Sequence, residues 1–300
     1  GGTLQHRFGV MQRSALQERG QENPHTLIMS ATPIPRTLSL TLFGDLDIST
    51  IDEMPAGRQK VATTWLEPEQ RDTAYGFIRK QVEEGRQAFV VCPLVDESET
   101  IESKAATEEY QRLSQDIFPD LSLGLLHGRM PGKEKDKVMR QFRDGELDIL
   151  VTTPVVEVGI DVANATVMMI DGADRFGLAQ LHQFRGRVGR GEHKSYCILM
   201  SDTNSETAKE RLSALARIHD GFQLAEVDLE LRGPGDFFGT RQSGLPSLKM
   251  AHISDRELLE LARNEATMLM EEDPDLEQPE HAAIAAQVAR FVDQASANVA

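Results

Sequence analysis

The stretch Ala88-Phe-Val-Val-Cys-Pro-Leu-Val95 is the longest apolar run of the chain, and it indicates a strand that is buried on both faces. A helical pattern at Glu69–Glu84, which ends at Gly85, precedes this run, and another at Lys104–Ile117 follows it. A buried strand between two helices is typical of a βαβ unit, in which helices cover both faces of a parallel sheet.

The same alternation continues on both sides of this run. Further strands are predicted at Val61–Leu66, Leu121–Leu126, Asp148–Thr152, Val167–Ile170 and Ser195–Met200. Further helices are predicted at Pro131–Arg143, Leu178–Arg190 and Glu206–His219. The sequence therefore predicts an α/β fold with a mostly parallel sheet, and ligands are expected at the carboxyl ends of its strands.

The stretch Gln183-Phe-Arg-Gly-Arg-Val-Gly-Arg190 holds three arginines and two glycines. On a helix of about 100° per residue, Gln183, Arg187 and Arg190 form one stripe. The opposite, apolar side of this helix holds Leu181, Phe184 and Val188. The stripe predicts an anion site, because guanidinium forks match phosphate oxygens better than lysine does. The alternative is a basic helix with a solvated face.

Composition restricts the class of protein. The 300 residues suggest two domains or one large domain with appendages, and 40% hydrophobic residues suffice for a real core. Only Cys92 and Cys197 occur, both in apolar strand-like runs, which favours a reducing compartment without disulfides. With no signal peptide or membrane-length apolar run, we expect a cytoplasmic protein without membrane partners.

The net charge of −16 is unusual for a protein that binds nucleic acid. Residues 251–300 hold 11 acidic residues against three arginines, so half of the net charge lies in the last sixth of the chain. The total charge therefore does not exclude a local basic groove elsewhere.

Three other patterns are interpreted as ordinary structure rather than as metal or phosphate sites. Ile51-Asp-Glu53 invites comparison with a magnesium-binding Asp-Glu box, but the apolar run before it is short, so we interpret it as a linker and predict no metal site. Gly128-Arg-Met-Pro-Gly-Lys133 has the wrong spacing for a phosphate loop. The basic helix that follows it is interpreted as a solvated face, with a phosphate-contact surface as the alternative.

Taken together, three motifs resemble those of superfamily 2 helicases: Ser30-Ala-Thr32 (motif III), Thr152 to Asp161 (motif V) and Gln183 to Arg190 (motif VI). A closer resemblance is to the RecG family, bacterial ATP-dependent DNA helicases of stalled forks and branched recombination intermediates. It lies in the segments Thr32–Thr37, Arg175–Gln183 and Asp228–Gly244. The transcription-repair coupling translocase shares most of these motifs.

The resemblance implies a two-lobed RecA-like motor with ATP between the lobes. Arg187 and Arg190 would be arginine fingers at the γ-phosphate, and Gln183 would sense the nucleotide. Gly159 and Asp161 would line the same cleft. ATP and Mg2+ are expected to be held mainly by the first lobe, which would lie upstream of this chain.

The resemblance also implies DNA contact or coupling to DNA for a set of polar residues: Ser30, Thr32, His127, Arg129, Thr152 and Thr153, with Arg232 and Arg241 in a translocation motif at Phe222–Gly244. The expected partners are branched DNA, namely forks and Holliday junctions, and ATP, and the protein is expected to be monomeric.

The expected domains are a remnant of the first lobe at 1–55, the second RecA-like lobe at 56–203, and the translocation motif with C-terminal helices at 204–300. Thr3 and Leu4 stand where the family has its acidic magnesium ligands, and no Walker A loop occurs. We therefore expect the C-terminal motor part of a branched-DNA helicase, inactive as an ATP hydrolase by itself. The alternatives are a non-catalytic module that binds DNA or a partner, and the motor of a transcription-repair coupling translocase.

Overall fold

The computed structural model of the chain describes residues 3–4, 27–29, 49–53, 58–93, 99–154, 162–232 and 256–297. The chain divides into two compact units, Gly1–Ile34 and Pro35–Ala300. In the first unit, β1 (Thr3–Leu4) pairs in parallel with β2 (Leu27–Ile28). The second unit contains the sheet that positions the candidate site.

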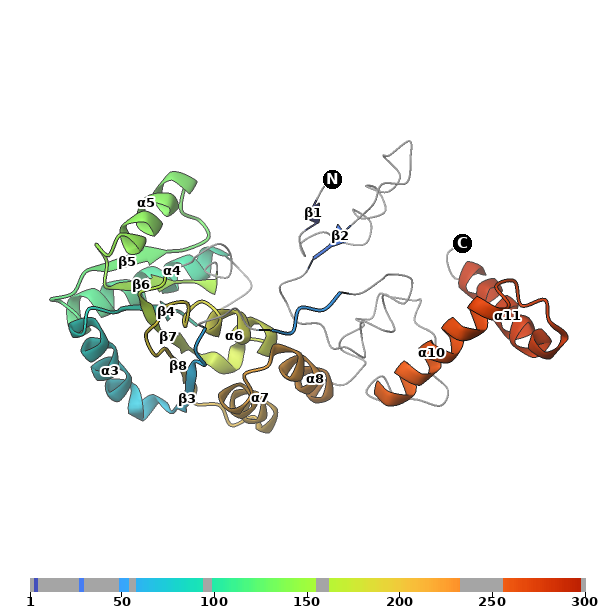
Figure 1. Ribbon diagram of the computed structural model, residues 1–300. Helices are drawn as coiled ribbons and strands as arrows, with labels where there is room; N and C mark the ends of the chain where they lie inside the picture. Colours follow the sequence, from blue (N-terminus) through green and yellow to red (C-terminus); the bar gives the residue numbers. More distant parts are fainter. Residues whose placement is uncertain are drawn as a thin grey trace. The chain divides into compact units, whose positions relative to one another are not determined.

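A six-stranded parallel sheet forms the centre of the second unit, with strand order β3-β8-β7-β4-β6-β5 (Figure 1). Its strands are β3 (Ala62–Leu66), β4 (Gln87–Val91), β5 (Leu123–Leu126), β6 (Ile149–Thr152), β7 (Ala165–Asp171) and β8 (Tyr196–Met200). The predicted strands are confirmed, although β4 ends at Val91, before Pro93, and β7 is longer than predicted.

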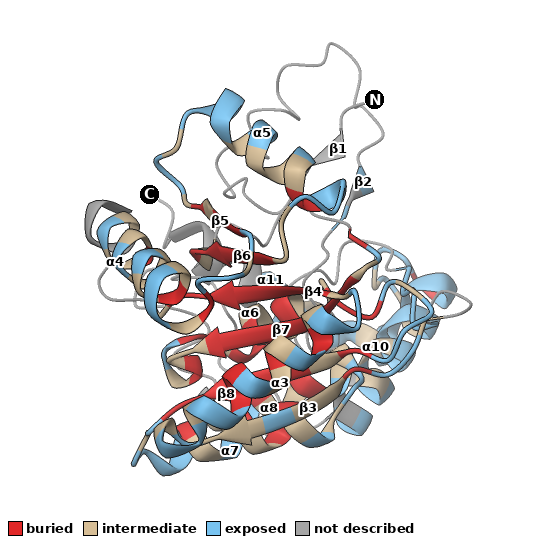
Figure 2. Ribbon diagram, turned by 90° about the vertical axis from the view of Figure 1, so that its left-hand side faces the viewer, coloured by how far each residue is buried: buried red, intermediate tan, exposed pale blue. Residues whose placement is uncertain are grey.

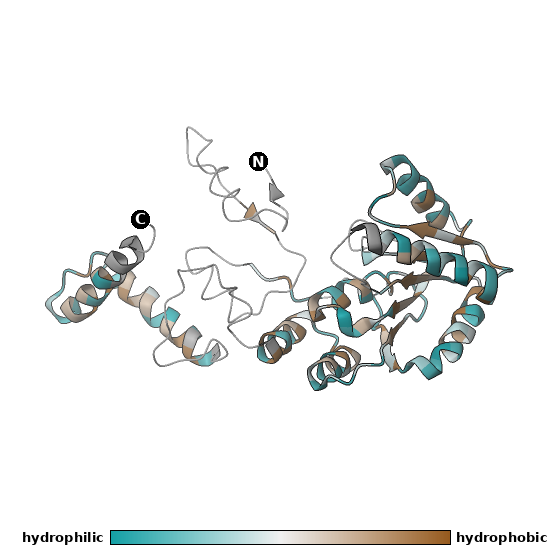
Figure 3. Cartoon of the chain, turned by 180° about the vertical axis from the view of Figure 1, so that it is seen from behind, coloured by the Kyte–Doolittle hydropathy of each residue, from teal (hydrophilic) through white to brown (hydrophobic). Residues whose placement is uncertain are grey.

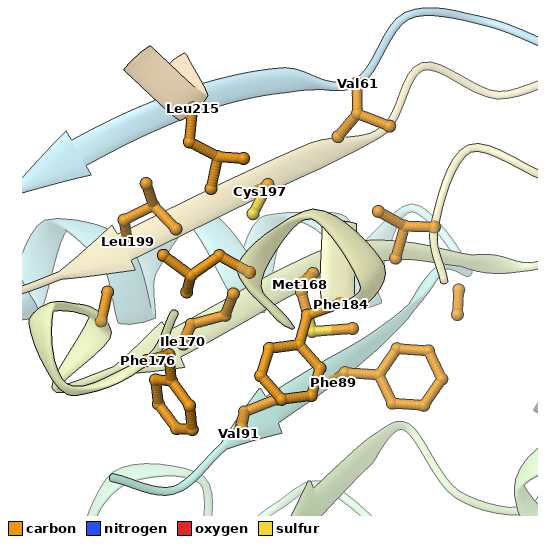
Figure 4. Packing of buried hydrophobic residues seen from close by; sticks show 14 of the residues in the cluster. Val61, Phe89, Val91, Met168, Ile170, Phe176, Phe184, Cys197, Leu199 and Leu215 are labelled. Atoms are coloured by element: carbon orange, nitrogen blue, oxygen red, sulfur yellow. The ribbon is translucent and has the colours of Figure 1, made fainter. Parts of the chain in front are cut away.

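The strands β4 to β8 are largely buried, as parallel strands between helices are, whereas the edge strand β3 is only partly buried (Figure 2). Alternate residues of β4 enter different cores: Phe89 and Val91 belong to one, and Ala88 and Val90 to the other. Figure 4 shows Phe89 close to Phe184 within the first core. This period of two explains why nearly every position of the central strands is apolar.

The helices lie in two layers. One layer holds α3 (Arg71–Glu83) and α4 (Glu99–Arg112), which ends in a π-helical turn at Leu113–Ile117. The other holds α5 (Gly132–Arg143), α6 (Leu178–Arg185), α7 (Glu206–Arg217) and α8 (Gly221–Arg232). Figure 3 shows hydrophobic strands between helices whose outer sides are largely hydrophilic. The structure thus confirms the α/β fold.

Two expectations about local structure are wrong. The helix predicted at Leu178–Arg190 ends at Arg185. The glycines and proline of Phe222–Gly244 predict an irregular segment, but it is helical as far as Arg232. The rest of that predicted segment, from 233 to 244, lies outside the described residues.

The C-terminal helices are α10 (Arg256–Glu272) and α11 (Ala282–Ala297). Asp273 closes the turn between them: its carboxylate accepts hydrogen bonds from the backbone amides of Glu277 and Gln278 and lies 2.8 Å from Nδ1 of His281. These hydrogen bonds hold the pKa of Asp273 below its ordinary value, with the contact to His281 as the largest cause. Of the helices within the described ranges, none has the length and hydrophobicity that a membrane span requires.

Candidate functional site

The arginine-rich segment begins in α6 and continues as a loop, residues 186–192, which we call the arginine loop. Two glycines shape it. Gly186 is the C-cap of α6, and Gly189 has φ +77°, a conformation that disfavours other residues. The predicted helical stripe of Gln183, Arg187 and Arg190 is therefore wrong, because the last two residues leave the helix.

The apolar side of this segment was predicted correctly. Leu181, Phe184 and Val188 are all fully buried. Phe184 packs edge-on against Phe176, with ring centroids 5.4 Å apart, and both rings point into the core in Figure 4. This packing anchors the residues that precede the arginine loop.

The arginine loop lies at the amino end of the sheet. A Cβ atom added to Gly189 would lie 2.9 Å from Cγ2 of Val61, just before β3, and one added to Gly191 would lie 2.6 Å from the carbonyl oxygen of Ala163, just before β7. Helix α6 starts beyond the carboxyl end of β7 and runs back along the sheet. The loop that follows its last residue therefore lies at the amino end of the strands.

A segment distant in sequence holds the loop in place. Nη2 of Arg58 donates a hydrogen bond of 2.7 Å to the carbonyl of Gly186, and Nε2 of Gln59 donates one of 2.7 Å to the carbonyl of Glu192. Nε of Arg190 reaches the same carbonyl of Gly186 at 3.2 Å. Arg190 is exposed on this fixed loop, and Arg187 is half-buried.

Arg185 has a separate, structural role that sequence reasoning missed. It is 3% exposed, and its guanidinium donates to the carbonyls of Leu215 (2.6 Å), Ile218 (2.8 Å) and His219 (3.3 Å) at the end of α7. Burial lowers its pKa. The sequence did indicate this burial, because Arg185 lies four residues after Leu181 and therefore on the same apolar side of α6.

His182 stands one turn before Arg185 on α6, and its Nδ1 lies 2.9 Å from Nη2 of Arg185. Burial, together with the charges of Arg185 and Arg58, lowers the pKa of His182 to about 4. The imidazole is therefore neutral near pH 7, so Nδ1 can accept a hydrogen bond from the arginine.

A second group of predicted site residues lies at the carboxyl end of the sheet. His127 directly follows β5, Thr152 ends β6, and Thr153 follows it. Burial, Lys135 and Arg129 lower the pKa of His127. Both threonines are buried, and the hydroxyl of Thr152 donates to the carbonyl of Thr153 at 2.8 Å.

The structure thus brings the predicted residues together in two groups at opposite ends of the strands. Gln183, Arg187 and Arg190 form the first, and His127, Arg129, Thr152 and Thr153 form the second. Arg232 ends α8. Ser30, Thr32, Gly159, Asp161 and Arg241 lie outside the described residues. Within the ranges described, no three His, Cys, Asp or Glu side chains are grouped as a metal site requires.

Two family models match the chain. Residues 70–192 match the helicase conserved C-terminal domain, and residues 218–299 match the C-terminal part of domain 3 of the ATP-dependent DNA helicase RecG. The ATP-dependent DNA helicase RecG of Bacillus subtilis is 51% identical over 281 residues, which are 93% of this chain and 41% of that protein. The chain belongs to the RecG family.

Other comparisons agree with membership of the RecG family. RecG of Thermotoga maritima is 51% identical over 87% of this chain and 34% of its own length. A structure of RecG bound to a three-way DNA junction matches with a TM-score of 0.64 and 46% identity, over 86% of this chain and 33% of that one. The chain thus spans about two fifths or less of these RecG relatives.

A more distant likeness shows the fold alone. S. cerevisiae Dbp5, in a structure bound to RNA and ADP BeF3, matches with a TM-score of 0.51 at 14% identity, over 77% of this chain and 62% of that one. The α/β architecture of this chain is therefore shared with a protein of very different sequence.

Proposed function

We propose that this chain supplies the second motor lobe and the translocation region of an ATP-dependent DNA helicase that acts on branched DNA, in fork regression and Holliday-junction branch migration. The domain boundaries near 55 and 203 belong to this proposal. Its main support is the arginine loop, in which the exposed Arg190 lies on a backbone held by hydrogen bonds from Arg58 and Gln59, within a chain about half identical to RecG proteins.

The chemistry of the loop fits a nucleotide phosphate. Arg190 is exposed and Arg187 lies three residues before it, so both belong to the loop whose ends Arg58 and Gln59 hold by hydrogen bonds. Preorganised cations stabilise charge that develops on a transferring phosphoryl group, and an arginine finger accelerates related hydrolases by about 10³–10⁵. Gln183, near the end of α6, would report nucleotide occupancy to this loop.

The described residues do not fit Mg2+, because they provide no group of carboxylates for it. We therefore assign Mg2+ and the cradle for the ATP phosphates to a first lobe, and derive no step through the metal from this chain. The 300 residues by themselves are expected to show no ATP hydrolysis.

The carboxyl-end residues would couple this lobe to DNA. The buried hydroxyl of Thr152 suits a relay rather than direct phosphate contact, because it is already donated to a carbonyl. His127 and Arg129 are more accessible and would face DNA, and Arg232, at the end of α8, would lead into the translocation motif.

The test joins this chain to the first motor lobe of the Bacillus subtilis relative and measures DNA-stimulated ATP hydrolysis. Arg190→Ala should reduce kcat at least about a hundredfold while ATP binding persists. Arg217→Ala is the matched control, because Arg217 is also exposed but lies at the end of α7, where its Nε donates to Ser213. Near-normal turnover of Arg190→Ala would refute the proposed finger.

A further inference from the structure

Helix α5 covers the outermost strand on one side of the sheet. It follows β5, one of the two edge strands, and lies beside it in Figure 2. Its residues Val138, Met139 and the fully buried Phe142 belong to the core. Its inner lysine, Lys135, donates to the carbonyl of Gly128 and so serves the local fold. No comparable hydrogen bond joins the other cations of α5 to the described residues; these are Lys133, Lys137, Arg140 and Arg143.

Three cations form a stripe on the outer side of α5. Lys133, Lys137 and Arg140 stand at i, i+4 and i+7, opposite the apolar side, and all three are exposed. We call this set the α5 stripe. The helix carries five cations and two acidic residues in a chain whose net charge is −16.

Several cations on other helices have a carboxylate partner on the same helix. Lys104 lies 3.9 Å from Glu108 on α4, and Lys209 lies 2.9 Å from Glu206 on α7. Within the described ranges, no ion pair joins a carboxylate to the α5 stripe. Like charges one turn apart, such as Lys133 and Lys137, destabilise a helix, so this arrangement does not serve the stability of α5 itself.

The dimensions of the stripe suit a nucleic-acid backbone. At 1.5 Å per residue, it extends for about 10 Å, and duplex DNA carries a negative charge for about every 1.7 Å of its axis. The stripe also begins just after His127 and Arg129, the corner that would face DNA in the proposed function. Arg129 and Lys133, the first residue of the stripe, are thus separated by only three residues in the segment that joins β5 to α5.

We propose that the α5 stripe binds the phosphate backbone of duplex DNA. The proposal rests on the proposed function, since it takes this chain to be part of a DNA motor, and it replaces the interpretation of α5 as a solvated face. Lysines bind phosphates as point charges, so the contact would be independent of base sequence and sensitive to salt.

The test uses the 300-residue chain and a fluorescein-labelled duplex of 20 base pairs, with binding followed by fluorescence anisotropy between 50 and 200 mM salt. Lys133→Glu with Lys137→Glu should weaken binding about a hundredfold at 50 mM and reduce the salt slope by about 2. Lys80→Glu with Lys104→Glu, on α3 and α4, changes the net charge equally on the other side of the sheet and should have a much smaller effect. The neutral pair Lys133→Ala with Lys137→Ala should weaken binding about tenfold.

Equal weakening by the two glutamate pairs would overturn the proposal, because only total charge would then matter. Absence of duplex binding by the unmodified chain would overturn it too, as would stronger competition by single-stranded RNA or polyglutamate than by duplex DNA. These outcomes are separate from the proposed function, whose test is ATP turnover in Arg190→Ala.

Discussion

Replacing Arg185 with Met should destabilise the α/β unit strongly. The guanidinium donates to three carbonyls at the end of α7, and Met fills a similar volume without any donor. A hydrogen bond from a charged donor contributes about 1.5–3 kcal/mol, and the relief of desolvating a buried arginine offsets part of the sum. We expect a net loss of about 3–5 kcal/mol, a large part of the 5–15 kcal/mol that is typical of folded proteins.

The chain offers a convenient probe for this measurement. Trp65 is its single tryptophan, lies in β3 and donates from Nε1 to the carbonyl of Ser201, so its fluorescence in urea reports unfolding of the sheet. Arg217→Met, on the exposed end of α7, is the control and should change stability by less than about 0.5 kcal/mol. If Arg185→Met unfolds within about 1 kcal/mol of the unmodified chain, the carbonyl contacts do not hold α6 to α7.

Three further outcomes are expected. The pKa of His182 is lowered to about 4 in the fold but is near 6.5 in an unfolded chain. The free energy of unfolding should therefore fall by about 3 kcal/mol as pH drops from above 6.5 to 4. In urea titrations, His182→Gln should flatten that pH dependence. Arg58→Ala should speed amide hydrogen exchange of residues 186–192 about tenfold, with Arg58→Lys intermediate; unchanged exchange would mean that Arg58 does not hold the loop. Gly189→Ala should cost about 1–3 kcal/mol, because of its φ of +77° and the 2.9 Å contact with Val61, and an unchanged urea midpoint would contradict this.

The sheet could be predicted from the sequence because its strands are short apolar runs bounded by turn residues and helices. Ala88–Val91 is buried on both faces, so every position of this stretch is apolar and the strand stands out as a continuous apolar run. Strand order was not predictable, since the pairing of β4 with both β6 and β7 is decided by packing between distant segments.

The end of α6 was mispredicted for a physical reason. A glycine costs a helix only about 1 kcal/mol, so Gly186 and Gly189 alone do not decide where the helix stops. The end of the helix is set by two residues more than a hundred positions earlier. Val61 leaves room only for a glycine at position 189, and Arg58 binds the carbonyl of Gly186, the C-cap of the helix.

The candidate site was predictable in its residue types but not in its placement. Gln183, Arg187 and Arg190 were identified by charge and spacing, whereas their position at the amino end of the sheet depends on the direction of α6. The anion and DNA roles of both groups stay predictions. Arg185 was overlooked although it shares the apolar side of α6 with Leu181, because an arginine in such a position does not by itself reveal the carbonyls that would satisfy it.

The placement of the two groups at opposite ends of the same strands has a mechanical consequence. Strands of four to seven residues separate them by about 13–23 Å, and each central strand is hydrogen-bonded on both sides, so the sheet resists bending. We expect the lobe to act as a lever: a small rotation imposed at the arginine loop would displace the His127 corner without any change inside the sheet. Slow amide exchange in β4 and β7, unaltered by nucleotide or DNA, would be the signature of such rigid-body transmission.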